Sequence, residues 1–196
     1  MENSTYTLIF TAVLIVAGLA GWFIDLKVSN QLKVKKQPLN ILISVIIMAI
    51  LFIVFGATIE TIKGFILFLL LQFASNSDIR IRQVENNIPL MIAITALIGI
   101  TMDQLPSMLL GVLVITIPQV AIDILKPGSI GGADIKISAT CALLLGLEKG
   151  LVFILAGLII AVISTAILKK IRRNCSKESI ALVPYLSVGC FIAYLL

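Results

Sequence analysis

The chain has 196 residues, of which 60% are hydrophobic and only 13% are charged, and its mean hydropathy is +1.15. A soluble fold of this length could not bury so many apolar side chains, so the composition excludes a soluble globular protein and predicts an all-α, polytopic membrane protein. We attribute the net charge of +5 to membrane topology and to anionic lipid of the inner leaflet, and expect no nucleic-acid partner.

Apolar runs between charged or turn-rich breaks predict eight transmembrane helices, because about 20 apolar residues cross a hydrocarbon core of about 30 Å. They lie at about 5–24, 41–59, 62–77, 88–102, 105–125, 135–147, 151–168 and 179–196. The first is expected to be a retained helix, since Glu2 stands where a signal peptide has basic residues. We divide the chain into a two-helix segment, 1–60, with a short basic cytoplasmic loop, and a six-helix core, 61–196.

The basic residues predict the orientation of the chain. With the N-terminus outside, only Lys63 and Lys149 of the 15 Lys and Arg residues fall on the outer side. The remainder gather in inner loops: Lys27, Lys33, Lys35, Lys36, Arg80, Arg82, Lys126, Lys136, Lys169, Lys170, Arg172, Arg173 and Lys177. This bias follows the positive-inside rule and predicts an inner, cytoplasmic membrane location with eight spans.

Two of the ten acidic residues differ from the rest in their expected depth. Asp78 lies 15 residues after Lys63, and Asp134 lies 14 residues before Glu148. At about 1.5 Å per helical residue, both acids lie roughly 21–22 Å from the outer boundary and roughly 8 Å below the inner one. Most other acids are expected to be solvated, and Asp25 is expected to end the first helix as a solvated or lysine-paired carboxylate.

Each of the two acids also has a purely structural interpretation. Asp78 could pair with Arg80 or Arg82 at a helix end, and Asp134 could cap the helix that follows it. An acid inside a membrane nevertheless indicates a functional site, and two acids at matched depth strengthen that interpretation. Two aspartates that share a proton can act as base and acid in hydrolysis by water. Helix dipoles favour Asp134 as the base and Asp78 as the acid.

No cofactor or metal is expected to take part. The chain has no histidine, and Cys141, Cys175 and Cys190 form no CxxC pair, so a zinc site or a disulfide framework is not predicted. We expect the cysteines to be buried packing residues.

The residues around Asp134 resemble the second motif of the type IV prepilin peptidases, GxGD followed by any residue, lysine and a hydrophobic residue. Here the stretch is Gly131-Gly132-Ala133-Asp134-Ile135-Lys136-Ile137. The family's first motif, an aspartate followed by basic residues and Ile-Pro-Asn, is matched by "DIRIRQVEN", which contains Asp78, Arg80, Arg82 and Asn86. Ala133 replaces the second glycine of the family motif, and Glu85 replaces the proline before Asn86.

The resemblance implies an intramembrane aspartic endopeptidase that uses Asp78 and Asp134. Its substrate would be a prepilin or pseudopilin with a basic leader, cut at the cytoplasmic face of the membrane. Gly131, Gly132, Ala133, Lys136, Arg80, Arg82 and Asn86 would then support the site or contact the substrate. Larger relatives carry a cytoplasmic segment with paired cysteines that is associated with N-methylation, so methyltransferase activity is not expected here.

Three other functions remain open at the level of sequence. A small proton- or cation-coupled transporter could use the same two aspartates, with Gln72 and Gln119 as further polar residues inside the membrane. A presenilin-like protease would need a Tyr-Asp pair, which the chain lacks. A membrane assembly protein without catalysis would make the matched depth of the acids a coincidence.

Overall fold

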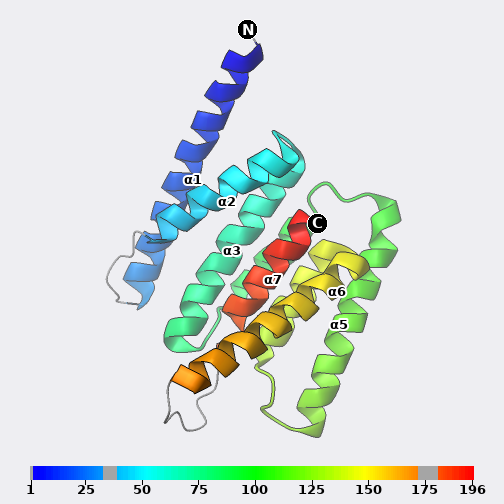
Figure 1. Cartoon of the computed structure of the whole chain (residues 1–196). Coiled ribbons are helices and arrows are strands. Elements are labelled where there is room, and N and C mark those ends of the chain that lie inside the picture. The colour runs from blue at the N-terminus through cyan, green and yellow to red at the C-terminus, as the bar shows by residue number, and fades with distance from the viewer. Residues whose placement is uncertain (1, 33–38, 172–180) are drawn as a thin grey trace.

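The fold is helical throughout the part of the chain that the structure describes. The computed structural model describes residues 2–32, 39–171 and 181–196, with side chains for 10–29, 39–170 and 181–196. Its α-helices are α1 (Glu2–Leu32), α2 (Leu39–Phe55), α3 (Ile59–Ile81), α4 (Asn87–Ala96), α5 (Leu105–Leu125), α6 (Gly132–Ile171) and α7 (Val183–Leu195) (Figure 1). One turn of 3-10 helix, η1 (Met102–Gln104), precedes α5. The predicted all-α class is confirmed.

Helix α6 consists of two helices joined at Gly146. This residue has φ 76° and ψ −173°, a backbone conformation that is essentially restricted to glycine. Both the beginning and the end of α6 lie toward the same end of the molecule, so its two halves run in opposite directions (Figure 1). They correspond to the predicted helices 135–147 and 151–168.

Among the described residues, four segments are long and apolar enough to cross a membrane, namely Phe10–Ser29, Ile59–Ile81, Met102–Leu125 and Gly132–Lys170. Helices α2, α4 and α7 are apolar but shorter. Large apolar side chains are exposed along α5, including Leu109, Leu113 and Ile117, as is expected of a surface that faces lipid. The chain is therefore an all-helical membrane protein, while the number of spans stays a prediction.

Two predicted helix ends differ most from the structure. Helix α1 continues past Asp25 to Leu32. Asp25 is only 4% exposed, and its Oδ1 accepts a hydrogen bond from Asn40 Nδ2 at 3.2 Å. The carboxylate is thus buried and bonded to α2, where we expected one that is solvated or paired with lysine; burial excludes the solvated alternative. Helix α4 ends at Ala96 instead of residue 102. The Leu97 N–H donates to the carbonyl of Ile94, three residues back instead of four, and this tighter turn closes the helix.

The two helices that carry Asp78 and Asp134 are bridged by the same neighbours. Both α4 and α7 pack against α3 and against α6. Leu71, Ile137, Phe153 and Leu186 are almost fully buried in the core between these helices. A hydrogen bond of 2.8 Å between the hydroxyls of Ser75 and Ser187 adds a polar contact between α3 and α7. The positions of the two aspartates therefore depend on α4 and α7.

Candidate active site

Asp78 lies in the last turn of α3 and is 9% exposed. Its Oδ2 accepts a hydrogen bond of 3.1 Å from the backbone N–H of Val183, the first residue of α7. The first N–H groups of a helix have no partner within that helix, and they form its positive end. The Asp78 carboxylate, which belongs to α3, therefore supplies a hydrogen-bond acceptor for a backbone N–H at the start of α7.

This contact opposes the dipole argument by which we assigned the roles of the acids. Asp78 ends α3, whose negative end favours a protonated carboxyl, but the start of α7 favours an ionised one. The Arg82 guanidinium also attracts the Asp78 carboxylate. Sequence alone offered no reason to place α7 here, because the contact uses a backbone group and no motif residue.

Asp134 lies in the first turn of α6 and is partly buried. Its carboxylate accepts the backbone N–H of Gly131 and lies within electrostatic reach of Asp78. Asp134 is therefore the third residue of α6 and not its N-cap residue, since α6 already begins at Gly132. A Cβ atom on Gly131 would come within 2.7 Å of Asp134 Oδ2, so a side chain at 131 would displace this carboxylate.

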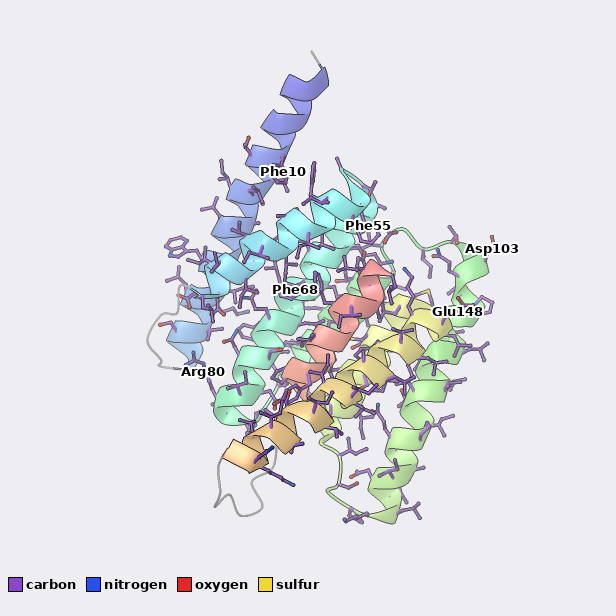
Figure 2. The ribbon with its side chains drawn as sticks, viewed as in Figure 1. Phe10, Phe55, Phe68, Arg80, Asp103 and Glu148 are labelled. Carbon is purple, nitrogen blue, oxygen red and sulfur yellow. The ribbon has the colours of Figure 1, made fainter. Side chains whose placement is uncertain are left out.

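Hydrogen bonds to backbone carbonyl groups close the turn that follows α3, next to Asp78. Arg82 ends α3 in the left-handed conformation, with φ 52°, and its N–H donates to the Asp78 carbonyl at 3.0 Å. The Ser77 hydroxyl donates to the Gln83 carbonyl at 2.7 Å. Arg80 lies in the last turn of α3, at the end of the molecule opposite Asp103 and Glu148 (Figure 2).

The two predicted motifs meet in a further contact. Lys136 Nζ donates to Asn86 Oδ1 at 2.8 Å and so connects the first turn of α6 to the segment between α3 and α4. Beside this contact Gly132 faces open space, and the Ala133 side chain is partly buried. We expected Lys136 to support the site or to contact the substrate; its partner in this structure is Asn86.

The site occupies the basic end of the molecule. The end of α3, the end of α5, both ends of α6 and the start of α7 lie together there (Figure 1). These helix ends carry Arg80, Arg82, Lys126, Lys136, Lys169 and Lys170. Lys33, Lys35, Lys36, Arg172, Arg173 and Lys177 lie outside the described residues. The two carboxylates therefore lie at the end of the molecule to which most of the described cations belong.

Metal ligands do not accompany the aspartates. Within the described ranges, no three His, Cys, Asp or Glu side chains come close enough together to hold a metal ion. Cys141 and Cys190 are buried, which confirms the prediction for these two, and Cys175 lies outside the described residues. The chemistry that this arrangement offers is that of two carboxyl groups within electrostatic reach of each other, where the charge on one disfavours ionisation of the other.

Comparison with known proteins confirms the resemblance. The model of the type IV leader peptidase family matches residues 65–166, which is more than half of the 196-residue chain. The match covers most of α3, all of α4 and α5 and most of α6, and it contains both Asp78 and Asp134. No curated protein and no solved structure matches the chain. The chain belongs to the type IV leader peptidase family.

Proposed function

We propose that this protein is an intramembrane aspartic endopeptidase that removes the leader of prepilin-like or pseudopilin-like substrates. Asp78 and Asp134 are its catalytic pair, and cleavage takes place at the cytoplasmic face of the cell membrane. The observation that carries the proposal is the approach of these two carboxylates from α3 and α6, inside the segment that matches the peptidase family. Residues 61–196 then form the peptidase core, without methyltransferase activity.

In the proposed reaction the carboxylate pair holds one proton. The ionised member removes a proton from water while the water oxygen attacks the scissile carbonyl carbon. The protonated member donates to the carbonyl oxygen, which gives a neutral tetrahedral intermediate. As the C–N bond breaks, the proton taken from water passes from the first carboxyl to the leaving nitrogen, and one hydroxyl of the intermediate returns its proton to the second carboxylate, so that the pair again holds one proton.

The backbone contacts support a shared proton more than a fixed assignment of roles. Asp78 accepts one N–H from Val183, and Asp134 accepts one from Gly131. Each donor stabilises the ionised form of its own carboxyl, so neither acid is singled out by its hydrogen bonds. We therefore propose that the two carboxyl groups titrate as a pair, and we no longer assign the resting acid to Asp78.

The surroundings support a peptide substrate that enters from the basic end. Open space beside Gly132 leaves room for an extended backbone next to Asp134. Arg80, Arg82 and Lys136 belong to the same end, where the inner leaflet would supply anionic lipid. With eight spans and the N-terminus outside, this end faces the cytoplasm, where a prepilin leader resides.

The experiment that tests the pair is co-expression with a prepilin, followed by the size of the pilin. Asp78→Asn and Asp134→Asn should each lower cleavage by about a thousandfold or more, because one carboxyl cannot serve as both acid and base. Asp103→Asn is the matched control, since Asp103 is exposed at the opposite end of the molecule (Figure 2). Efficient processing by either of the first two variants would reject the pair.

Transport by the same aspartates receives less support than hydrolysis. Gln72 would have to line an ion pathway in a transporter, but its amide is buried between α2 and α3. There it donates to the Asn40 carbonyl at 2.9 Å, and its Oε1 accepts the Ser44 hydroxyl at 2.9 Å. Membership of a peptidase family favours hydrolysis as well.

A further inference from the structure

A polar cavity lies at the end of the molecule opposite the aspartates. Its volume is about 290 Å³, and it is lined by residues of α2, α3, η1, α5, α7 and the kink of α6. The polar lining consists of Glu60, Lys63, Gln104, Ser107, Lys149 and Tyr194. Phe55 contributes part of the apolar lining, and Figure 2 shows it at the same end as Asp103 and Glu148.

Lys63 is the unusual residue of this cavity. It is only 7% exposed, and no hydrogen-bond or ion-pair partner for its ammonium group is found among the described residues. The acid nearest to it in sequence, Glu60, is bound by a different residue. The Tyr194 hydroxyl donates toward the Glu60 carbonyl oxygen at 2.7 Å and toward its Oε2 at 3.0 Å. Lys63 belongs to the cavity lining, so an anion that enters the cavity can pair with this ammonium group while most of the side chain stays buried.

The remaining lining residues indicate the kind of anion. Lys149 adds a second, exposed cation, so the cavity holds two ammonium groups against the single carboxylate of Glu60. Gln104 adds amide donors, and Phe55 and Met108 add apolar surface. Two cations with amide donors suit an oxyanion with several acceptor oxygens, and the apolar side suits a small organic group attached to it.

We propose that this cavity binds a phosphate group, with Lys63 as its buried ion partner and Lys149 at its mouth. The volume admits the phosphate of an anionic phospholipid headgroup or of a small soluble phosphate ester. Binding there would hold α3 and the kink of α6 together from the end opposite the aspartates. The proposal is independent of proteolysis, because none of the residues in the cavity belongs to the proposed catalytic pair.

Binding can be measured on the purified full chain in detergent, at constant ionic strength. The probes are inorganic phosphate, glycerol 3-phosphate, short-chain phosphatidylglycerol and short-chain phosphatidylcholine, followed by titration calorimetry and by the shift in unfolding temperature. Lys63→Gln should weaken binding of the anionic probes by about tenfold or more, since one charge-assisted contact is lost. Lys149→Gln should weaken it by about threefold, because this side chain is exposed.

Two variants serve as controls. Lys126→Gln removes an exposed lysine at the opposite end of the chain and should bind every probe as the wild type does. Lys63→Arg keeps the charge and should stay within about threefold of the wild type. If Lys63→Gln does not fold, the comparison of Lys149→Gln with Lys126→Gln decides, since both residues are exposed.

The probes separate the two sources of phosphate. Tighter binding of phosphatidylglycerol than of glycerol 3-phosphate supports a lipid headgroup, and equal binding supports a soluble phosphate. The proposal is overturned if the wild type binds no anionic probe, if phosphatidylcholine binds as tightly as phosphatidylglycerol, or if the Lys63→Gln and Lys149→Gln variants bind like Lys126→Gln. Cleavage is not the readout, so a failure here is distinguishable from a failure of the proposed peptidase activity.

Discussion

At the scale of single residues, the candidate site is built on backbone amides as much as on side chains. Asp78 is held by the N–H of Val183 and Asp134 by the N–H of Gly131. A backbone amide is fixed in position only if the segment that contains it is fixed. The geometry of the two aspartates therefore depends on the start of α6 and on the start of α7. The closest such contact is at Gly131, whose backbone lies directly beside the Asp134 carboxylate.

Gly131→Ala should therefore disturb the Asp134 carboxylate. The added Cβ would stand 2.7 Å from Asp134 Oδ2, so the carboxylate or the turn has to move. Displacing a catalytic group by about 1 Å commonly costs about tenfold to a hundredfold in rate, and we expect a loss of this size in kcat. The measurement is the rate of prepilin cleavage by purified enzyme at saturating substrate.

Gly132→Ala provides the comparison. A Cβ at this position meets nothing within 4 Å, so it enters the space that we assign to the substrate backbone. This variant should raise KM more than it lowers kcat. Equal losses of kcat in the two variants would contradict the assignment of Gly131 to the aspartate and of Gly132 to the substrate.

The sequence predicted the two aspartates of this proposal, but it did not predict the groups that hold them in place. The depth estimate paired Asp78 with Asp134 because Lys63 and Glu148 mark the outer ends of their helices. The same reasoning could not find Val183, whose contribution is a backbone N–H next to no recognisable motif. It also treated Lys63 as a surface marker, whereas the folded chain encloses this lysine between helices that are distant in sequence.

At the scale of elements, a buried polar network connects α1 and α2 to the helix that carries Asp78. Asn40 is its centre, since its Nδ2 donates to Asp25 and its Oδ1 accepts from Gln72 Nε2 at 3.3 Å and from Asn76 Nδ2 at 3.2 Å. Satisfied networks of this kind fix one arrangement of helices, and partial loss leaves several groups without partners. The network lies on α3 within two turns of Asp78.

Asn40→Leu should destabilise the protein by about 2 kcal/mol or more, because it leaves a buried carboxylate and two amides without one of their partners. The measurement is the unfolding temperature in detergent. Asn87→Leu is the matched change at an exposed asparagine and should cost less than about 0.5 kcal/mol. An equal effect of both changes would show that the network does not support the fold.

The elements themselves were predicted well where apolar runs alone decide them. The run at 105–125 matches α5, and the two runs at 135–147 and 151–168 match the halves of α6, whose kink falls between them. The end of the first helix could not be predicted, because a charged residue normally ends an apolar run. Asp25 is an exception, since residues on α2 supply the hydrogen bond that water would otherwise provide.

At the scale of the whole molecule, the two ends differ in chemical character. One end carries the aspartates and most of the described basic residues, and the other carries Asp103, Glu148 and the cavity around Lys63 (Figure 2). This division follows the positive-inside rule if the aspartate end faces the cytoplasm. The proposed cleavage at the cytoplasmic face therefore requires this orientation of the molecule in the membrane.

Labelling of single cysteines in intact cells tests this orientation. In a chain whose own cysteines are replaced by alanine, Asp103→Cys should react with a membrane-impermeant maleimide added outside. Lys126→Cys should react only after the membrane is permeabilised, because it follows α5 at the opposite end. Both positions are exposed, so a difference in labelling reports the side of the membrane and not burial. The reverse pattern would place the aspartates outside and exclude cleavage at the cytoplasmic face.

The contact between Val183 and Asp78 has a consequence for the order in which the protein is made. Helix α7 follows both aspartates in the chain, so α3 and α6 leave the ribosome before α7 does. Until α7 inserts, Asp78 lacks its amide donor, and α3 and α6 lack one of the two helices that bridge them. On the proposed assignment of the two aspartates, a nascent chain that already contains both motifs still lacks the contact that holds Asp78 until α7 has inserted.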